Sequence, residues 1–537
     1  MKYIEKTFYD YPLSGLGLNP FLSKILQTYD LNEENMKDLF EPPKLLNPYE
    51  AKGMLECGKI LKRIKENHEK ILICGDYDAD GICATAILAI AFTYIGIDFG
   101  YYIPDRIKEG YGLNCDTVRK ALGKGYRNFI TVDNGVKAYD AMKLIKEAGA
   151  VLILSDHHEY ESEKIWCDCF LHPQTMGDAF LTLSGAGVAA MIGRMLYPQS
   201  KEIIILAGIA SIADCMPMWK QTRSLTRLAI QYLNQGMMPA IQKLKNRKFD
   251  PVDETLIGFQ IAPKINGTGR MSDIANANNT VRYLLSSQEK LLDSASKQIE
   301  EVNQIRKQLS KAMCEKASQY FNEEERFPLI VDQSFHEGIV GLVAGQLSSQ
   351  YQRPVMVMSE KAGICKGSAR ANGSLDLVDF FADFPYFSLF GGHKAAIGCS
   401  FEKMYERPLR EYITHRMLHQ KLQEPQLSVI EVKEEELDII NVESLDILRP
   451  FGTGFEEPIF KVLVQIEKLV SLQGGQHVKV TSIRGIDYMF FNQLHDLNYH
   501  VNDWVVMVGK VSINRFLNSK KVQMNVLDSQ LFNATFQ

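Results

Sequence analysis

Apolar and polar residues alternate in patterns that change several times along the 537 residues of the chain. An amphipathic stretch at 50–70 precedes the apolar run ILIC at 71–74, and a helix is predicted to begin near Cys83. The segments RNFITVDNG at 127–135 and AVLILSDHH at 150–158 repeat this order of an apolar run followed by polar residues. Strands that alternate with helices form mostly parallel sheets, so residues 56–285 are predicted to form one α/β domain.

Three other patterns fill the rest of the chain. Residues 286–326 contain neither Gly nor Pro and carry apolar residues at helical spacing, which predicts one long connecting helix. A β-α-β pattern restarts at 327–425 and predicts a second α/β domain, and the short alternating segments of 426–537 fit a small β-barrel. Residues 1–55 form an N-terminal segment with Pro-rich punctuation around one short helical stretch.

The composition is that of a soluble globular protein, with 46% hydrophobic and 23% charged residues. No apolar run reaches the roughly 20 residues that span a bilayer, and the N-terminus has no apolar signal region, so we expect a cytoplasmic protein without a membrane contact. The ten cysteines are scattered, which favours thiols in a reducing compartment, and Cys167 and Cys169 are interpreted as structural. A net charge of −5 neither supports nor excludes a nucleic-acid partner.

Carboxylates and imidazoles follow three predicted strands in succession. In parallel sheets the carboxyl ends of the strands share one edge, where ligands bind. Hard divalent ions take carboxylate oxygens, and manganese also accepts imidazole nitrogen, so such ions would offset the repulsion between like charges. The alternative is that each Asp only caps or turns the chain. The occurrence at three strand ends favours a metal site, built from Asp76, Asp78, Asp80, Asp133, Asp156, His157 and His158.

Two divalent ions about 3.5–4 Å apart can activate a water and clamp the attacking and leaving oxygens of a phosphoryl transfer. A serine nucleophile has no candidate, because the segment LSGAG at 183–187 lacks the G-x-S-x-G turn of serine hydrolases. The residues therefore favour metal-dependent hydrolysis of a phosphoester over covalent catalysis.

At this point the motifs carry a resemblance to a known family. GDYDADG, TVDNG and SDHH resemble the first three motifs of the DHH phosphoesterase superfamily, and the segment ADCMPM at 213–218 resembles the fourth. GSAR at 367–370 and GGHKAAIG at 391–398 resemble its DHH-associated substrate-binding domain. The segments at 262–273, 334–347 and 450–460 are similar to the RecJ family of single-strand-specific exonucleases, whose C-terminal domain is an OB-like barrel. The ordered set covers roughly residues 56 to 535.

The resemblance implies roles for the matching positions and a cofactor of two manganese or magnesium ions. Asp78 and Asp80 would each hold a metal, and Asp133 would bridge the two ions. His157 and Asp214 would complete the shell of the second ion. His158 would face the substrate phosphate, while Asp76 would support the ligands or bind more weakly. Many smaller family members have a His where this chain has Cys74, which we interpret as a core residue.

The substrate side is also implied by the resemblance. Arg106 and Tyr111 match a segment that handles the terminal phosphate of the strand. A surface ion pair is the alternative for each Arg, a turn for the glycine pair, and packing for the histidine at 336. The other expected substrate contacts are Arg270, His336, Ser368, Arg370, Gly391, Gly392 and His393.

Small barrels of this kind bind single strands through a basic groove and stacked aromatics. One of Phe490 and Phe491 must face the core, because neighbours on a strand point to opposite faces. The stretch NRFLNSKK at 514–521 is expected to be a basic loop. The barrel residues predicted to contact DNA are Lys479, Arg484, Arg515, Phe516, Lys520 and Lys521.

The function expected from this resemblance is a metal-dependent exonuclease that releases nucleotides from the 5′ end of single-stranded DNA in recombination and repair. Its expected partners are single-stranded DNA, a single-stranded-DNA-binding protein and a RecQ-type helicase, with the chain acting as a monomer. One alternative is a DHH phosphodiesterase for short oligonucleotides or cyclic dinucleotides, which would need only residues 56–425. Another is a non-catalytic scaffold, which would typically have lost the metal ligands that are present here.

Overall fold

The structure is a computed structural model that describes residues 2–9, 17–322, 324–422, 426–472, 477–491, 498–516 and 519–532. It divides into two compact units. The first unit takes in the described residues of 1–41, 424–451 and 455–537, and the second takes in those of 42–423 and 452–454. The N-terminal segment up to residue 41 therefore folds with the C-terminal residues. Within the described residues, no helix is both long and apolar enough to cross a membrane.

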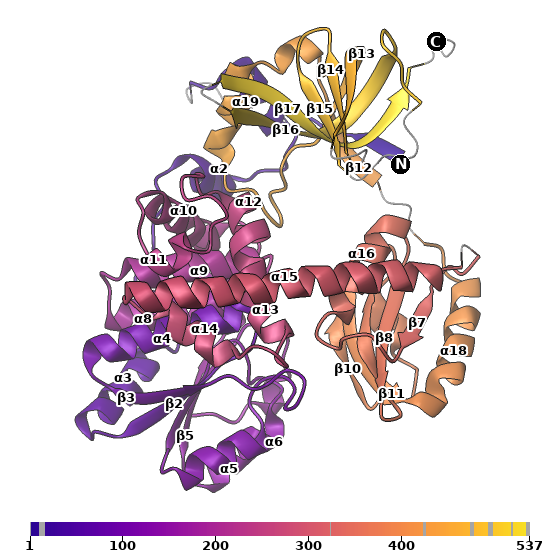
Figure 1. Cartoon of the computed structure of the whole chain (residues 1–537). Helices are drawn as coiled ribbons and strands as arrows, with labels where there is room; N and C mark the ends of the chain where they lie inside the picture. Colours follow the sequence, from indigo (N-terminus) through magenta and orange to yellow (C-terminus); the bar gives the residue numbers. More distant parts are fainter. Residues whose placement is uncertain are drawn as a thin grey trace. The chain divides into compact units, whose positions relative to one another are not determined.

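The second unit contains a five-stranded sheet in the order β3-β2-β4-β5-β6, and Figure 1 shows β2, β3 and β5 of this sheet. All neighbouring strands run parallel, as the sequence predicted. The central strands are buried because helices cover both faces of the sheet, which accounts for their apolar β-branched sequences. The strands are β2 Lys70–Cys74, β3 Asp98–Tyr102, β4 Asn128–Thr131, β5 Val151–Ser155 and β6 Cys169–Leu171.

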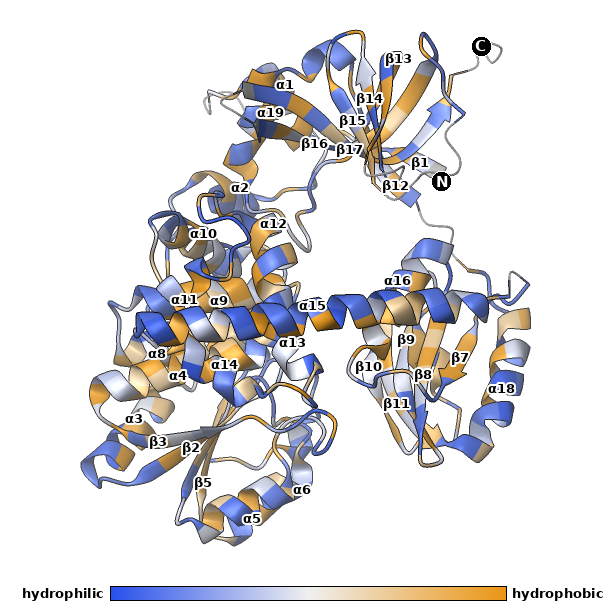
Figure 2. Cartoon of the chain, in the orientation of Figure 1, coloured by the Kyte–Doolittle hydropathy of each residue, from blue (hydrophilic) through white to orange (hydrophobic). Residues whose placement is uncertain are grey.

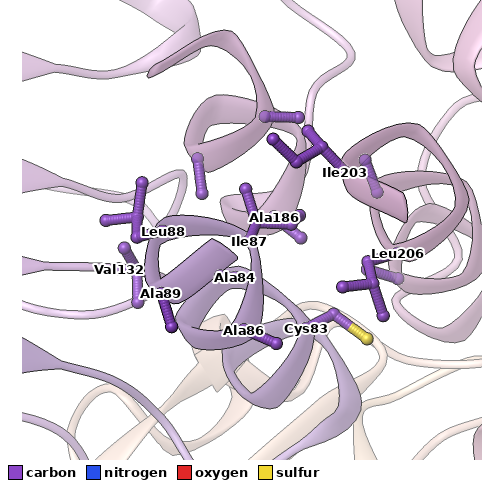
Figure 3. Close-up of a cluster of buried hydrophobic side chains, with 14 of the residues drawn as sticks. Cys83, Ala84, Ala86, Ile87, Leu88, Ala89, Val132, Ala186, Ile203 and Leu206 are labelled. Atoms are coloured by element: carbon purple, nitrogen blue, oxygen red, sulfur yellow. The ribbon is translucent and has the colours of Figure 1, made fainter. Parts of the chain in front are cut away.

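Helix α4 (Ala79–Ile95) follows β2 and is apolar around its whole circumference. It is buried against α8 (Gly185–Leu196) and α9 (Lys201–Ala213), and Figure 3 shows Ile87 of α4 near Ala186 of α8. The helix begins four residues before the predicted start at Cys83. The reason is that the carboxylate of Asp78 caps the helix by accepting a 3.0 Å hydrogen bond from the backbone N–H of Gly81.

Further helices complete this part of the second unit. Helices α5 (Cys115–Gly123) and α6 (Tyr139–Glu147) share a separate apolar core with the sheet. A continuous helical segment at 254–270 consists of α12, the π-helical turn η4 and α13. The remaining helices and turns are η1 Pro48–Glu50, α3 Met54–Glu66, η2 Ser162–Lys164, α7 Pro173–Met176, η3 Asp178–Phe180, α10 Lys220–Asn234, α11 Pro239–Gln242, α12 Glu254–Leu256, η4 Ile257–Ile261, α13 Ala262–Arg270 and α14 Ala277–Leu284.

Helix α15 (Glu289–Gln319) is the predicted long helix, with 31 residues and a length of about 46 Å at about 1.5 Å per residue. It packs against α13 and against α16 (Val340–Tyr351), as Figure 1 shows. Its hydropathy in Figure 2 is mostly hydrophilic with interspersed hydrophobic positions, as expected for a helix that buries one side.

A second five-stranded sheet follows α15, in the order β10-β11-β9-β8-β7. Strands β7 and β8 are parallel and the other pairs are antiparallel. Aromatic side chains, among them Phe380 and Phe401, fill its core. The elements are β7 Leu329–Asp332, β8 Val355–Lys361, β9 Ile364–Arg370, α17 Leu377–Phe381, β10 Leu389–His393, β11 Ala396–Glu402, η5 Lys403–Tyr405 and α18 Glu406–Leu418.

The first unit contains a closed five-stranded barrel, because β13 pairs with both β14 and β16. An additional parallel pair, β1 with β12, extends the sheet from β13. Phe490 is buried and Phe491 is 46% exposed, as the alternation of strand residues requires. The elements are β1 Lys2–Glu5, α1 Pro20–Leu26, α2 Glu33–Phe40, β12 Gln426–Glu431, η6 Glu434–Glu436, α19 Ile439–Ser444, η7 Leu445–Leu448, β13 Phe460–Leu472, β14 His477–Ser482, β15 Asp487–Phe491, β16 Trp504–Phe516 and β17 Ser519–Leu531.

The stretch at 514–521 differs from the expectation of a basic loop. Residues 514–516 end strand β16, and residues 519–521 begin strand β17. These two strands pair in register up to Phe516 and Ser519, so most of the stretch is a strand hairpin. Cross-strand pairing of two 13-residue strands outweighs the low strand propensity of its Asn residues.

Candidate active site

The ends of β2, β4 and β5 bring the predicted metal-binding side chains together. There are three groups of possible ligand atoms, and within each group the atoms lie within 4.8 Å of one another. Asp133 and His157 each belong to two of these groups. Groups that share a ligand can hold two adjacent ions. The groups are Asp76, Asp78 and Asp133; Asp80, His157 and Asp214; and Asp133, His157 and His158.

The negative charge of this cluster exceeds the positive charge near it, although the charges of His158 and Arg106 act on Asp76. Burial raises the pKa of Asp133 well above its usual range, and the neighbouring carboxylates raise it further. Burial, followed by the charges of Asp80 and Asp78, raises the pKa of Asp214 to about 8. Among the described residues, the Oδ1 atoms of Asp76 and Asp133 are buried and accept no hydrogen bond. Buried carboxylate oxygens without donors fit divalent cations.

His157 completes the cluster from the third strand end. Its Nε2 lies 3.1 Å from Asp133 Oδ1, 3.6 Å from Asp214 Oδ2 and 3.7 Å from Asp80 Oδ2. Burial lowers the pKa of His157 despite the carboxylates around it. The neutral imidazole is the form that coordinates metals, so this histidine also fits a metal ligand.

Asp80 is held by the N-terminus of α8. Its carboxylate accepts hydrogen bonds from the hydroxyl of Ser184 at 2.8 Å and from the backbone N–H groups of Gly185 and Ala186 at 2.7 and 2.9 Å. A Cβ atom at Gly185 would lie 2.4 Å from the Cβ of Asp133, so only glycine fits there. The role of the segment LSGAG in holding Asp80 was not predicted from the sequence, where this segment was considered only for a serine nucleophile. Ser184 is the N-cap of α8, and a serine at this position is typical of helix starts.

Asp156 orients the histidine pair instead of joining the shared groups of ligand atoms. It accepts hydrogen bonds from His158 Nδ1 at 2.8 Å and from the backbone N–H of His157 at 2.7 Å. Burial lowers the pKa of His158, but the hydrogen bond to Asp156 and its charge raise that pKa to about 9. The hydroxyl of Tyr111 lies 3.2 Å from His158 Nδ1 and donates to the backbone carbonyl of Asp133 at 3.0 Å. His158 is thus a half-exposed cation at the edge of the cluster.

A cavity of about 260 Å³ in the same unit contains several of the predicted substrate contacts. No ion pair involving Arg106, Arg270 or Arg370 occurs in the described part of the chain. Burial, followed by the charge of Arg106, lowers the pKa of Arg270 to about 10. Half-buried guanidinium groups that repel each other and form no ion pair suit the binding of an anion. The lining includes Tyr77, Arg106, Tyr111, Arg270, Glu337, Lys366, Ser368 and Arg370.

Helix α13 links this cavity to the carboxylate cluster. The side chain of Asn266 accepts a 2.8 Å hydrogen bond from the backbone N–H of Ala79, next to Asp78. Arg270 ends the helix and lines the cavity. His336 lies 3.1 Å from Asp273 Oδ1 and is not part of the lining, so the structure gives it a carboxylate partner.

The other predicted contacts of the second sheet lie on β10. Gly391, Gly392 and His393 are exposed, and Leu389 of the same strand lines the cavity. Gly392 has a φ of 141°, and a Cβ atom there would lie 2.3 Å from the carbonyl oxygen of Ala396. This position therefore requires glycine for pairing with β11, and the proposed contacts of the three residues with substrate stay predictions.

The predicted barrel cations are all engaged with carboxylates. Lys479 and Lys521 lie 3.8 and 2.9 Å from Asp487. Arg484 lies 3.0 Å from Glu435. Arg515 and Lys520 lie 3.0 and 2.7 Å from Glu443. The side chain of Phe516 lies outside the described residues. The barrel thus presents paired cations and not an open basic groove at these positions.

The fold and the site define a protein of the DHH family. The DHH family N-terminal domain matches residues 70–216, the DHHA1 domain matches 325–414, and the RecJ OB domain matches 430–528. The chain has all three domains in this order, and it is a RecJ-type member of the DHH phosphoesterase superfamily.

Comparison with individual proteins gives the same assignment. The single-stranded-DNA-specific exonuclease RecJ of Bacillus subtilis is 29% identical over 96% of this chain and 68% of the relative. RecJ of Haemophilus influenzae is 27% identical over 83% of this chain and 84% of the relative. The crystal structure of Thermus thermophilus RecJ with Mn²⁺ covers 99% of this chain and 80% of its own, with a TM-score of 0.85 and 22% identity. A manganese-bound exonuclease RecJ covers 70% of this chain and 97% of its own, with a TM-score of 0.62 and 25% identity.

Proposed function

We propose that this protein is a metal-dependent exonuclease that hydrolyses phosphodiester bonds of single-stranded DNA from the 5′ end and acts in DNA recombination and repair. One observation carries the proposal. A carboxylate–histidine cluster with an excess of negative charge and a cavity lined by three arginines that form no ion pair among the described residues belong to one unit. They are joined by α13, which contacts the chain next to Asp78 at Asn266 and reaches the cavity at Arg270.

The residues that would hold two manganese or magnesium ions are Asp78, Asp80, Asp133, His157 and Asp214. Asp76 adds a sixth candidate, because its Oδ1 is buried and without a donor among the described residues. When bound, such ions supply a Lewis acid that activates water and offsets the negative charge of the phosphate. The segment 184–186 holds Asp80 in place through its three hydrogen bonds.

The other residues bind and orient the strand. Arg106, Arg270 and Arg370 offer guanidinium donors to a terminal phosphate. The hydroxyl of Ser368 donates to the carbonyl of Ile397 at 2.6 Å and accepts a hydrogen bond from Arg370, so Ser368 positions that guanidinium. His158 is held as a cation by Asp156, so its ring can donate a hydrogen bond to a phosphoryl oxygen at the edge of the cluster. Because the arginines of the cavity suit a terminal phosphate, the strand would be held by its phosphorylated end.

A DHH phosphodiesterase for short oligonucleotides or cyclic dinucleotides would not need the RecJ OB domain at 430–528, so this domain supports the longer substrate. As partners we propose a single-stranded-DNA-binding protein and a RecQ-type helicase, with the chain acting as a monomer in the cytoplasm. The free cysteines, most of which are buried, support a reducing compartment.

The test follows nucleotide release from end-labelled single strands with Mn²⁺, with Mg²⁺ and with EDTA. Wild type should release nucleotides from the 5′ end only with metal, and Asp133→Ala should abolish release. The matched control is Asp140→Ala, which removes an exposed carboxylate on α6 and should leave the rate unchanged. Intact DNA together with cleaved dinucleotides would overturn the substrate assignment, and DNA binding without any cleavage would favour a scaffold.

A further inference from the structure

The second unit exposes two aromatic side chains next to a short basic loop. Phe249 is 90% exposed and Phe259 is 79% exposed, which makes them the most exposed aromatic residues in the described part of the chain. The loop before Phe249 has the sequence KNRK and contains Lys245, Arg247 and Lys248. We call these five residues the basic–aromatic surface. Exposed aromatic rings beside cations that have no ion pair mark a candidate binding surface.

The cations of this surface differ from those of the barrel. Arg247 and Lys248 form no ion pair with any described carboxylate. The ammonium of Lys248 lies 5.7 Å from the ring centre of Phe249, and Lys245 donates a 2.9 Å hydrogen bond to the backbone carbonyl of Asp250. Positive charge without a counter-charge, interleaved with aromatic rings, is typical of surfaces that bind single-stranded nucleic acid.

The loop is anchored to the helical segment that leads to the candidate active site. The backbone N–H of Asn246 donates to the side chain of Gln260 at 3.2 Å. Lys264 is only 4% exposed and donates to the carbonyl of Leu244 at 2.6 Å and to the side chain of Asn246 at 2.8 Å. Its third partner is Glu300 on α15, at 2.7 Å. A buried, fully engaged lysine thus holds the loop against the start of the helix.

The same helical segment ends at the arginine cavity. Eleven residues separate Phe259 from Arg270, which corresponds to about 16 Å along a helix. This distance equals about five nucleotides at the stacked rise of about 3.4 Å. Asn266 lies between them and contacts the chain next to Asp78. A strand whose terminal phosphate occupies the cavity can therefore reach the basic–aromatic surface with the nucleotides that follow.

We propose that the basic–aromatic surface binds single-stranded nucleic acid a few nucleotides beyond the site of cleavage. Arg247 and Lys248 contact phosphates, and Phe249 and Phe259 stack on bases. This inference rests on the proposed function, because the occupant of the surface is the distal part of the same substrate.

The first test measures binding of a fluorescent 20-nucleotide strand by anisotropy in EDTA, where no cleavage is needed. Phe249→Ala/Phe259→Ala should weaken binding about fivefold to a hundredfold, as loss of base stacking does. Arg247→Gln/Lys248→Gln should reduce the slope of log K against log [salt] by about 1.4, or about 0.7 per phosphate contact. The controls are Leu55→Ala for an exposed apolar residue and Lys124→Gln/Lys146→Gln for exposed, unpaired lysines on or beside α5 and α6, and both should bind as wild type does.

The second test compares 5′-phosphorylated strands of 3 and 20 nucleotides as substrates with Mn²⁺. The surface variants should cleave the short strand at the wild-type rate and bind the long strand more weakly. Unchanged affinity and salt slope for the long strand would overturn the inference and leave the surface to a protein partner. A wild-type protein that binds strands but cuts neither length would contradict the proposed function instead, and the anisotropy test would still decide the inference.

Discussion

The strand-end carboxylates and the barrel cations are both clusters of like charge, but only the barrel cations are each paired with an opposite charge. Each predicted barrel cation lies within 4 Å of a carboxylate, as Arg515 does with Glu443. Burial and the neighbouring carboxylates raise the pKa of Asp133 and of Asp214, and among the described residues the buried Oδ1 atoms of Asp76 and Asp133 have no donor. A charged cluster that its own chain does not neutralise is built for a ligand, whereas a neutralised one gives no such indication.

The arginine cavity and the basic–aromatic surface resemble the carboxylate cluster in this respect. Both present cations without counter-charges in the described part of the chain, and both connect to α13 or to the turn before it. The carboxylate cluster, the arginine cavity and the basic–aromatic surface therefore all contact the helical segment 254–270 of the second unit. By this criterion the substrate path is more clearly marked on the catalytic unit than on the barrel surface.

The largest expected effect comes from Asp133. Asp133→Asn should lower the cleavage rate with Mn²⁺ by at least about a thousandfold, because it removes the carboxylate shared by two groups of ligand atoms. The same change should raise the melting temperature in EDTA by about 2–10 °C, since it removes a buried charge that neighbouring carboxylates disfavour. Activity assays and thermal unfolding check the two effects, with Asp140→Asn as the control. A lower melting temperature in EDTA would show that the carboxylate stabilises the fold without metal.

A smaller effect is expected in the arginine cavity. Arg370→Gln should reduce kcat/KM for 5′-phosphorylated strands about 10- to 100-fold, the range for losing one charge-assisted hydrogen bond. The effect on strands with a 5′ hydroxyl should be much smaller, because the terminal phosphate is missing. Arg407→Gln, at an exposed arginine paired with Glu411, is the control. Equal losses on both substrates would place the cavity's role in folding or in binding another part of the strand.

The catalytic fold could be predicted because its signals are local. Each of β2, β4 and β5 is an apolar β-branched run, and most of the predicted ligands follow these runs within a few residues. Parallel pairing then brings the strand ends together without further information. The role of Asp214, which follows the last residue of α9, was predicted only from the family resemblance.

The parts that could not be predicted depend on contacts between distant residues. Ser184 holds Asp80 across 104 positions of sequence, and nothing near either residue indicates the pairing. The four-residue strand β1 finds its partner β12 only in the folded unit. Glu443 neutralises Lys520 from 77 positions away, so the sequence suggested an open basic patch where the structure has ion pairs.

The pH dependence of stability should separate the two clusters. The pKa of Asp214 is about 8 in the folded protein against an ordinary value of 3.8, so the folded state binds more protons between these pH values. In EDTA the free energy of unfolding of the second unit should therefore fall as pH rises from about 4 to about 8. The pairs with Lys520 and Arg515 lower the pKa of Glu443. Their contribution to the stability of the first unit is therefore lost as pH falls.

Hydrogen exchange, measured in EDTA at pH 5 and pH 8, reports how protection depends on pH separately for the segments 76–80 and 439–444. Asp214→Asn should reduce the loss of protection with rising pH in residues 76–80 and leave residues 439–444 unchanged. Saturating Mn²⁺ should also remove that trend, since bound cations favour the ionised carboxylates at every pH in the range. Protection of 76–80 that increases with pH in EDTA would contradict the assigned charge imbalance.

The smallest effect is expected from releasing barrel cations. Glu443→Gln removes the shared partner of Arg515 and Lys520, which would free both cations for phosphate contacts. Binding of a 20-nucleotide strand in EDTA should tighten about two- to fivefold, and the salt slope should steepen by up to about 1.4. Glu411→Gln removes a paired carboxylate on α18 as the control. Tighter binding would show that ion pairing masks a nucleic-acid surface on the barrel. Weaker binding would show that Glu443 instead holds the two cations in the position that meets the strand, and neutralisation by a carboxylate would then be no argument against a binding role.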